Sequence, residues 1–131
     1  MREIKFRGLM TTGEWVYGYL TEDAPDSTRY YETCPFRIHW HDEQGQHNAP
    51  VKKETVGQFT CLKDRNGVEI YEGDVIKTSL GVIAVVEWEK AGRFLGFTEK
   101  RELVYIGREP LVQVIGNIHE NRELLEAPDE A

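Results

Sequence analysis

A chain of 131 residues is long enough for one compact domain, or for two small subdomains that share a core. Its 23 acidic residues outnumber its 16 basic residues, and the resulting net charge of −7 excludes a strong overall field that would attract nucleic acid or an anionic membrane. The 40% hydrophobic content and the 12 glycines favour a globular fold of strands joined by many turns.

The compartment is indicated by the cysteines and by the apolar runs. Cys34 and Cys61 lack the spacing of a metal finger. The basic N-terminal residues 1–7 are not followed by the apolar stretch of a secretory signal. The longest apolar run, residues 82–86, is far shorter than the roughly 20 residues of a membrane-spanning helix. We therefore expect a cytoplasmic protein that has no membrane partner.

The N-terminal residues show the alternation of a half-buried strand. Ile4 and Phe6 alternate with charged residues over positions 2–7, and Gly8 then permits a turn. Residues 14–20 are rich in aromatic and β-branched side chains, which favour a second strand. These two segments predict a hairpin.

The region that follows has weaker signals. Residues 29–40 are aromatic and compatible with a strand, whereas residues 42–50 are polar and lack clear periodicity. A long excursion or an irregular hairpin is expected here, and residues 42–50 are the candidate for a flexible loop.

The second half of the chain contains clear turn signals. Asn66-Gly67 predicts a tight hairpin because both residues tolerate a positive φ, and Glu72-Gly73-Asp74 predicts a second turn. Residues 122–126 predict one helical turn near the C-terminus. Strands are expected at residues 54–60, 68–71, 75–78, 82–88, 93–98 and 111–118.

This spacing predicts a mainly β fold, a small barrel or sandwich of short antiparallel strands with a short C-terminal helical turn. A single domain is expected over residues 1–131. Within it, residues 1–53 would hold the N-terminal strands and the long loop, and residues 54–131 would form a small β-barrel.

One acidic segment invites comparison with a calcium-binding loop. Asp64 to Gly67 place oxygen atoms before a glycine, as such loops do. Two positions where the loop requires ligands hold Leu62 and Gly73 instead, so a plain turn is favoured over a calcium site.

Three further acids, Glu69, Glu72 and Asp74, are candidates for acid–base chemistry, which needs two carboxyl groups in different environments. Acids that flank turns are usually solvated. Asp74 is instead expected to accept backbone N–H bonds at its turn.

His39 and His41 lie on the same face if their segment is a strand, and Cys34 or His47 would then complete a metal site. Such a site would suit a metal-dependent hydrolase. Histidines at this spacing are a weak signal, and a nucleophile at Cys34 or Cys61 has no visible activating context. No catalytic, cofactor-binding or metal residue is therefore assigned, and no cofactor is expected.

An aromatic platform for nucleic acid is a further alternative, because small β-barrels bind single strands by stacking bases on aromatic rings. The acidic net charge favours core packing of these rings instead. The aromatic residues are Trp15, Tyr17, Tyr19, Tyr30, Tyr31, Phe36 and Trp40, and the cations that would follow the phosphates are Arg2, Lys5, Arg7, Lys52 and Lys53.

Four stretches that span nearly the whole chain carry a family resemblance. They are MREIKFRG at 1–8, GEWVYGYL at 13–20, ETVGQFT at 54–60 with LKDRNGVEIYEGDVI at 62–76, and VIGNIHEN at 114–121. In these stretches the chain resembles the YopX family of small bacteriophage and prophage proteins. Cys61 stands where the family pattern usually has Gly, and Lys53 stands where Pro is often found. Because glycine favours a positive φ, the first departure raises the question whether the residue at position 61 adopts one.

The resemblance implies a mostly β fold, a phage origin and a bacterial host cytoplasm, and it carries no established activity. We expect a non-enzymatic binding or assembly protein that contacts a host or phage protein or its own copies. Exposed strand edges and the aromatic segment 30–40 are the features that would make such contacts. The alternatives are a nucleic-acid-binding small β-barrel protein and a metal-dependent hydrolase.

Overall fold

The computed structural model describes residues 4–22, 35–89, 92–106, 112–121 and 123–126. The chain divides into two compact units, Met1–Phe59 and Thr60–Ala131. None of the helices in the described part of the chain has the length and apolar character needed to cross a membrane.

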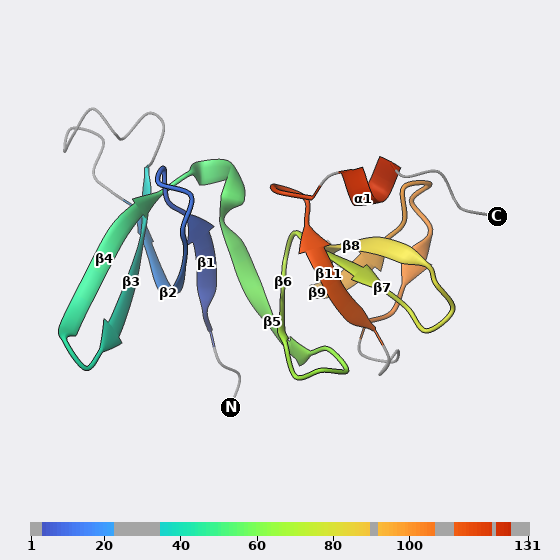
Figure 1. The fold of residues 1–131 in the computed structure, drawn as a ribbon, viewed down its shortest axis with the longest axis horizontal. Helices are drawn as coiled ribbons and strands as arrows, with labels where there is room; N and C mark the ends of the chain where they lie inside the picture. Colours follow the sequence, from blue (N-terminus) through green and yellow to red (C-terminus); the bar gives the residue numbers. More distant parts are fainter. Residues whose placement is uncertain (1–3, 23–34, 90–91, 107–111, 122, 127–131) are drawn as a thin grey trace. The chain divides into compact units, whose positions relative to one another are not determined.

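The first unit is built on an antiparallel sheet. Its elements are β1 (Phe6–Leu9), β2 (Trp15–Glu22), β3 (Phe36–Asp42), β4 (Gly45–Val51), the short 3-10 helix η2 (Lys53–Thr55) and β5 (Gly57–Lys63). The strand order is β4-β3-β2-β1-β5, and consecutive hairpins account for most of it (Figure 1). Strand β5 continues into the second unit, where it pairs with β6 (Glu69–Tyr71).

The core of the first unit lies on one face of this sheet. Cross-strand pairing sets Ile38 opposite Ala49 and Phe36 opposite Val51, so these side chains share that face. Ile38 and Val51 are fully buried. Gly8 allows close packing here, because a Cβ at this position would lie 2.7 Å from the Val51 Cβ.

The N-terminal strand differs from the prediction in two respects. Strand β1 runs through Gly8, and the chain reverses at Gly13, where φ is +96°. Ile4 is 66% exposed, whereas Arg7 is 6% exposed and its Cζ lies 4.7 Å from the centre of the Trp15 ring. The charged residue is buried because its stem packs in the unit and the indole face attracts the guanidinium.

The flexible loop expected at residues 42–50 is wrong, because this segment forms the turn and second strand of a hairpin. The hairpin expected as an alternative is confirmed. β3 and β4 pair continuously from Phe36–Val51 to Asp42–Gly45. Asp42 Oδ1 accepts the N–H of Gln44 at 2.8 Å, and Gly45 supplies the positive φ of the turn. The periodicity was weak because the outward side chains of β4 are polar and the strand contains Pro50.

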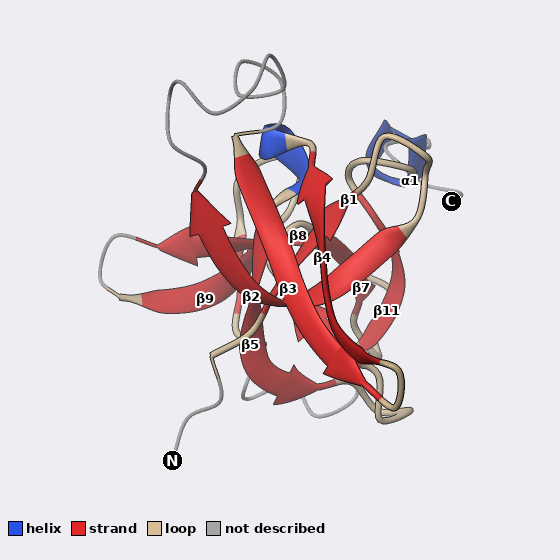
Figure 2. Ribbon diagram, turned by 90° about the vertical axis from the view of Figure 1, so that its left-hand side faces the viewer, coloured by secondary structure: helices blue, strands red, loops and turns tan. Residues whose placement is uncertain are grey.

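The second unit contains a five-stranded antiparallel sheet. Its strands are β7 (Asp74–Lys77), β8 (Ile83–Glu89), β9 (Arg93–Phe97), β10 (Leu103–Val104) and β11 (Gln113–Asn117), and the short helix α1 (Glu123–Glu126) follows. The strand order is β10-β9-β8-β7-β11. Figure 2 shows that strands make up most of the described structure.

An aliphatic cluster forms the core of the second unit. Ile70 of β6, Ile76 of β7 and Val86 of β8 are fully buried in it, together with Ile106 and Val112. The predicted mainly β antiparallel fold and the C-terminal helical turn are confirmed. In the described residues the strands form open sheets and not a closed barrel. Strand β10 was not predicted, since two residues carry no periodicity.

Cys61 adopts a positive φ of 71° within β5, the conformation in which glycine is favoured. The ladder is irregular here, since the Leu62 N–H donates to Thr60 Oγ1 at 3.1 Å. A left-handed conformation costs a non-glycine residue about 1–2 kcal/mol, and a glycine at the same position would remove this cost. Glycine also has a higher conformational entropy in the unfolded state, which offsets about 0.5–1 kcal/mol of that gain.

We therefore expect Cys61→Gly to raise the free energy of unfolding by about 0.5–1 kcal/mol in a urea titration. Cys61→Ala is the matched control, because it removes the thiol and keeps the Cβ. Equal stabilisation by the two variants would show that the thiol, and not the backbone, is responsible.

Candidate functional site

The turn between β7 and β8 is closed by the side chain of Thr78. Its Oγ1 accepts the N–H of Leu80 at 3.3 Å and the N–H of Val82 at 3.1 Å. Gly81 donates its N–H to the Thr78 carbonyl at 2.9 Å and has a φ of +86°. These bonds fix the turn and leave the Leu80 side chain 88% exposed at its tip.

The turn between β9 and β10 is closed in the same way by Thr98. Thr98 Oγ1 accepts the N–H of Glu102 at 3.0 Å, and the Thr98 N–H donates to the Glu102 carbonyl at 2.9 Å. Arg101 in this turn forms a bidentate ion pair with Glu87 of β8, with N–O distances of 2.8 and 3.2 Å. The turn thereby holds β10 beside the rest of the sheet.

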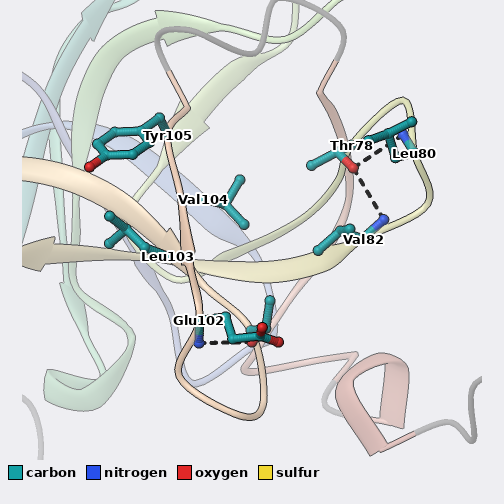
Figure 3. A pocket seen from close by; sticks show the side chains of 8 residues that line it. Thr78, Leu80, Val82, Glu102, Leu103, Val104 and Tyr105 are labelled. Carbon is teal, nitrogen blue, oxygen red and sulfur yellow. Dashed lines mark hydrogen bonds between the residues drawn. The ribbon is translucent and has the colours of Figure 1, made fainter.

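A hollow of about 410 Å³ lies between these two turns. Figure 3 shows Leu80 and Val82 of the first turn across the hollow from Leu103 and Val104, with Tyr105 following them along the chain. We call the surface formed by these five residues the apolar groove. Leu80, Val82, Leu103 and Tyr105 are 88%, 39%, 42% and 44% exposed. Large apolar side chains gathered around a hollow are typical of an interaction site.

The lining of the hollow combines large apolar side chains with a few polar groups. Glu102 is the one carboxyl group among the described residues that line the hollow, and the hydroxyls of Thr78 and Thr98 already accept backbone N–H bonds. The Tyr105 phenol is a second titratable group in the same lining. Burial of apolar side chains is what this surface offers.

Asp64, the candidate calcium ligand, is held by backbone donors. Its Oδ1 accepts the N–H groups of Asn66 at 2.8 Å and Val68 at 2.9 Å, and its Oδ2 accepts the N–H of Val114 at 2.9 Å. Burial opposes ionisation, but the donated N–H bonds outweigh it and lower the pKa of the Asp64 carboxyl below its usual value. The hairpin at Asn66-Gly67 is confirmed, with a φ of +82° at Gly67.

The other acids of this region also serve the turns. Asp74 is 2% exposed, and its Oδ2 accepts the N–H of Tyr71 at 2.8 Å, as predicted from the sequence. Glu69 Oε1 accepts the Tyr71 hydroxyl at 3.0 Å. Gly73 has a φ of +93°, which confirms the second turn.

The pairing of β3 with β4 separates the histidines. His39 and His41 lie on one face of β3, whereas His47 lies opposite Trp40 on the other face, and its ring stacks on the indole at 5.4 Å. His47 therefore does not converge with the other two. Cys34 lies outside the described residues. The part of the chain that the structure describes contains no group of three potential metal ligands.

The pairing of β2 with β3 places the residues of the proposed aromatic platform on opposite faces of the sheet. Tyr17 and Tyr19 share one face of β2 and are 45% and 71% exposed, but Phe36 and Trp40 lie on the opposite face of the sheet. Trp15 is covered by Arg7, and Lys5 Nζ lies 5.1 Å from the Phe59 ring centre. Two of the seven proposed aromatic residues, Tyr30 and Tyr31, and the cation Arg2 lie outside the described residues.

Sequence reasoning did not identify the apolar groove. One signal could have indicated it, because Leu80 lies between Ser79 and Gly81 in a turn where polar residues are the norm. An apolar side chain at the tip of a turn stays exposed to water when the chain folds, so it gains no stabilisation from burial.

The two sheets and the short final helix define a small antiparallel β protein of two units. The family model for the YopX protein matches residues 5–126, so the chain belongs to the YopX family. The crystal structure of protein EF1440 from Enterococcus faecalis is similar, with 27% sequence identity and a TM-score of 0.54, over 94% of this chain and 98% of that chain. No curated protein gives a significant match.

Proposed function

We propose that this YopX-family protein is a non-enzymatic binding protein that holds a protein partner in the apolar groove. The observation that carries the proposal is the gathering of four exposed apolar side chains around one hollow. Covering apolar surface contributes about 25 cal/mol per Å² removed from water, which makes such a surface a favourable anchor. Buried anchors of this kind dominate the affinity of protein interfaces.

The origin and the compartment are part of the same proposal. The YopX resemblance supports a protein encoded by a bacteriophage or prophage that acts in the cytoplasm of its bacterial host. The partner is then a host or phage protein with an exposed aliphatic or aromatic side chain.

We expect Leu80→Asp and Leu103→Asp to weaken binding of the partner about tenfold or more, because each places a charge in a surface that must be desolvated. The partner is first captured by cross-linking in host cells and identified by mass spectrometry. Its affinity for each purified variant is then measured by calorimetry. Val68→Asp is the matched control, because Val68 is a 48% exposed apolar residue that does not line the groove.

Three results would contradict the proposal. The first is a captured partner whose affinity is unchanged by Leu80→Asp. The second is an equal loss with Val68→Asp. The third is self-association that rises with concentration and is abolished by Leu80→Asp, since the occupant would then be a second copy.

A further inference from the structure

A second hollow adjoins the apolar groove on the other side of the turn between β7 and β8. It measures about 440 Å³, and it shares Thr78 and Leu80 with the apolar groove. Its remaining lining is polar and includes two cations. We call the surface formed by Arg65, Lys77, Ser79 and Gln113 the cationic hollow.

The fold brings these residues together from three distant segments. Lys77 on β7 and Gln113 on β11 are direct cross-strand partners. The Arg65 N–H donates to the Val112 carbonyl at 3.0 Å, which fixes the Asn66-Gly67 hairpin beside β11. Ser79 follows Lys77 in the turn that also carries Leu80.

The two cations of the cationic hollow form no ion pair with the residues that the structure describes. Arg65 and Lys77 are both exposed. Asp64 attracts Arg65 electrostatically, but both Asp64 oxygens already accept backbone N–H bonds. In a chain with 23 acidic and 16 basic residues, a polar hollow that holds two cations and no acid among its described lining residues favours an anion from outside.

We infer that the partner segment carries an acidic side chain a few residues from its apolar anchor. This inference rests on the proposed function. The apolar side chain occupies the apolar groove, and the carboxylate reaches Arg65 and Lys77 across the turn that carries Leu80. The net charge of −7 repels acidic partners in general, so the cationic hollow selects one register of an acidic segment.

The test uses a library of short random peptides, selected on the immobilised full chain. The wild type is expected to enrich sequences that combine a large apolar residue with a nearby Asp or Glu. A chain with Arg65→Glu and Lys77→Glu is expected to retain the apolar preference and to exchange the acidic preference for Lys or Arg. A chain with Lys53→Glu and Lys63→Glu has the same net charge and no change in either hollow, so it should select acidic peptides as the wild type does.

A synthetic peptide with a sequence from the wild-type selection then shows how much the two cations contribute to the binding affinity. Its dissociation constant is expected to rise about tenfold or more for the chain with Arg65→Glu and Lys77→Glu, because two attractive contacts become repulsive. The neutral pair Arg65→Gln and Lys77→Gln should abolish the acidic preference without repulsion. This second variant guards against a folding defect caused by a new acid beside Asp64.

The outcomes separate the inference from the proposed function. Apolar peptides without an acidic preference would overturn the inference alone, as would an acidic preference that survives Arg65→Glu and Lys77→Glu. Failure to enrich any apolar peptide, or enrichment that Leu80→Asp does not reduce, would overturn the proposed function as well.

Discussion

The Asp64→Ala variant is expected to lose about 4 kcal/mol of unfolding free energy, because three backbone donors would lose their acceptor. The N–H groups of Asn66, Val68 and Val114 all point at this carboxylate, which is 7% exposed. Hydrogen bonds to a charged group contribute about 1.5–3 kcal/mol each, and these three lie at the lower end of that range because they are part-buried. Urea unfolding followed by tryptophan fluorescence measures the loss.

Asp64→Asn is the matched variant, because it keeps one carbonyl oxygen in the same place. That oxygen can accept the N–H groups of the Asn66-Gly67 hairpin or the N–H of β11, but not both. We therefore expect a loss of about 2 kcal/mol of unfolding free energy. A loss below about 1 kcal/mol for Asp64→Ala would mean that water replaces the carboxylate and that the residue does not hold the turn to β11.

Gly18→Ala is expected to destabilise the first unit by about 3 kcal/mol or more. A Cβ at position 18 would overlap with the His39 carbonyl oxygen, and that oxygen belongs to the backbone and cannot rotate away. β2 and β3 would have to separate at the point where Tyr19 pairs with His39. Chemical unfolding gives the size of the loss, and faster amide exchange in β3 locates it.

Gly13→Ala provides the comparison within the same region. Gly13 has a φ of +96°, and a Cβ there would have no neighbour within 4 Å. The substitution therefore introduces backbone strain of about 1–2 kcal/mol and no steric overlap. If Gly13→Ala destabilised the protein as much as Gly18→Ala, the close approach of β2 and β3 would not be the cause.

The sequence predicted those features whose cause is local. Asn66-Gly67 and Glu72-Gly73-Asp74 form turns because their own backbone and side chains favour them. The family resemblance raised the question of a positive φ at position 61, and Cys61 adopts one. Gly8 was misjudged because its role depends on Val51, a residue of another strand. Local patterns do not contain that information.

The apolar groove could not be predicted for the same reason. Its two sides come from separate turns, closed by Thr78 and Thr98, and they meet because β8 and β9 pair between them. β10 has only two residues and leaves no periodic pattern in the sequence. The charged and polar residues of the cationic hollow are equally scattered along the chain.

The bond between the Asp64 carboxylate and Val114 joins residues 50 positions apart, and this separation has a consequence for the order of events during synthesis. While the ribosome is still making the intervening chain, the hairpin at Asn66-Gly67 can form but one oxygen of its central acid must remain bound to water. Pairings that span so much sequence form slowly, because the connecting chain loses entropy before the contact is made. We therefore expect maturation of this half to wait until Val114 has been synthesised and has left the ribosome.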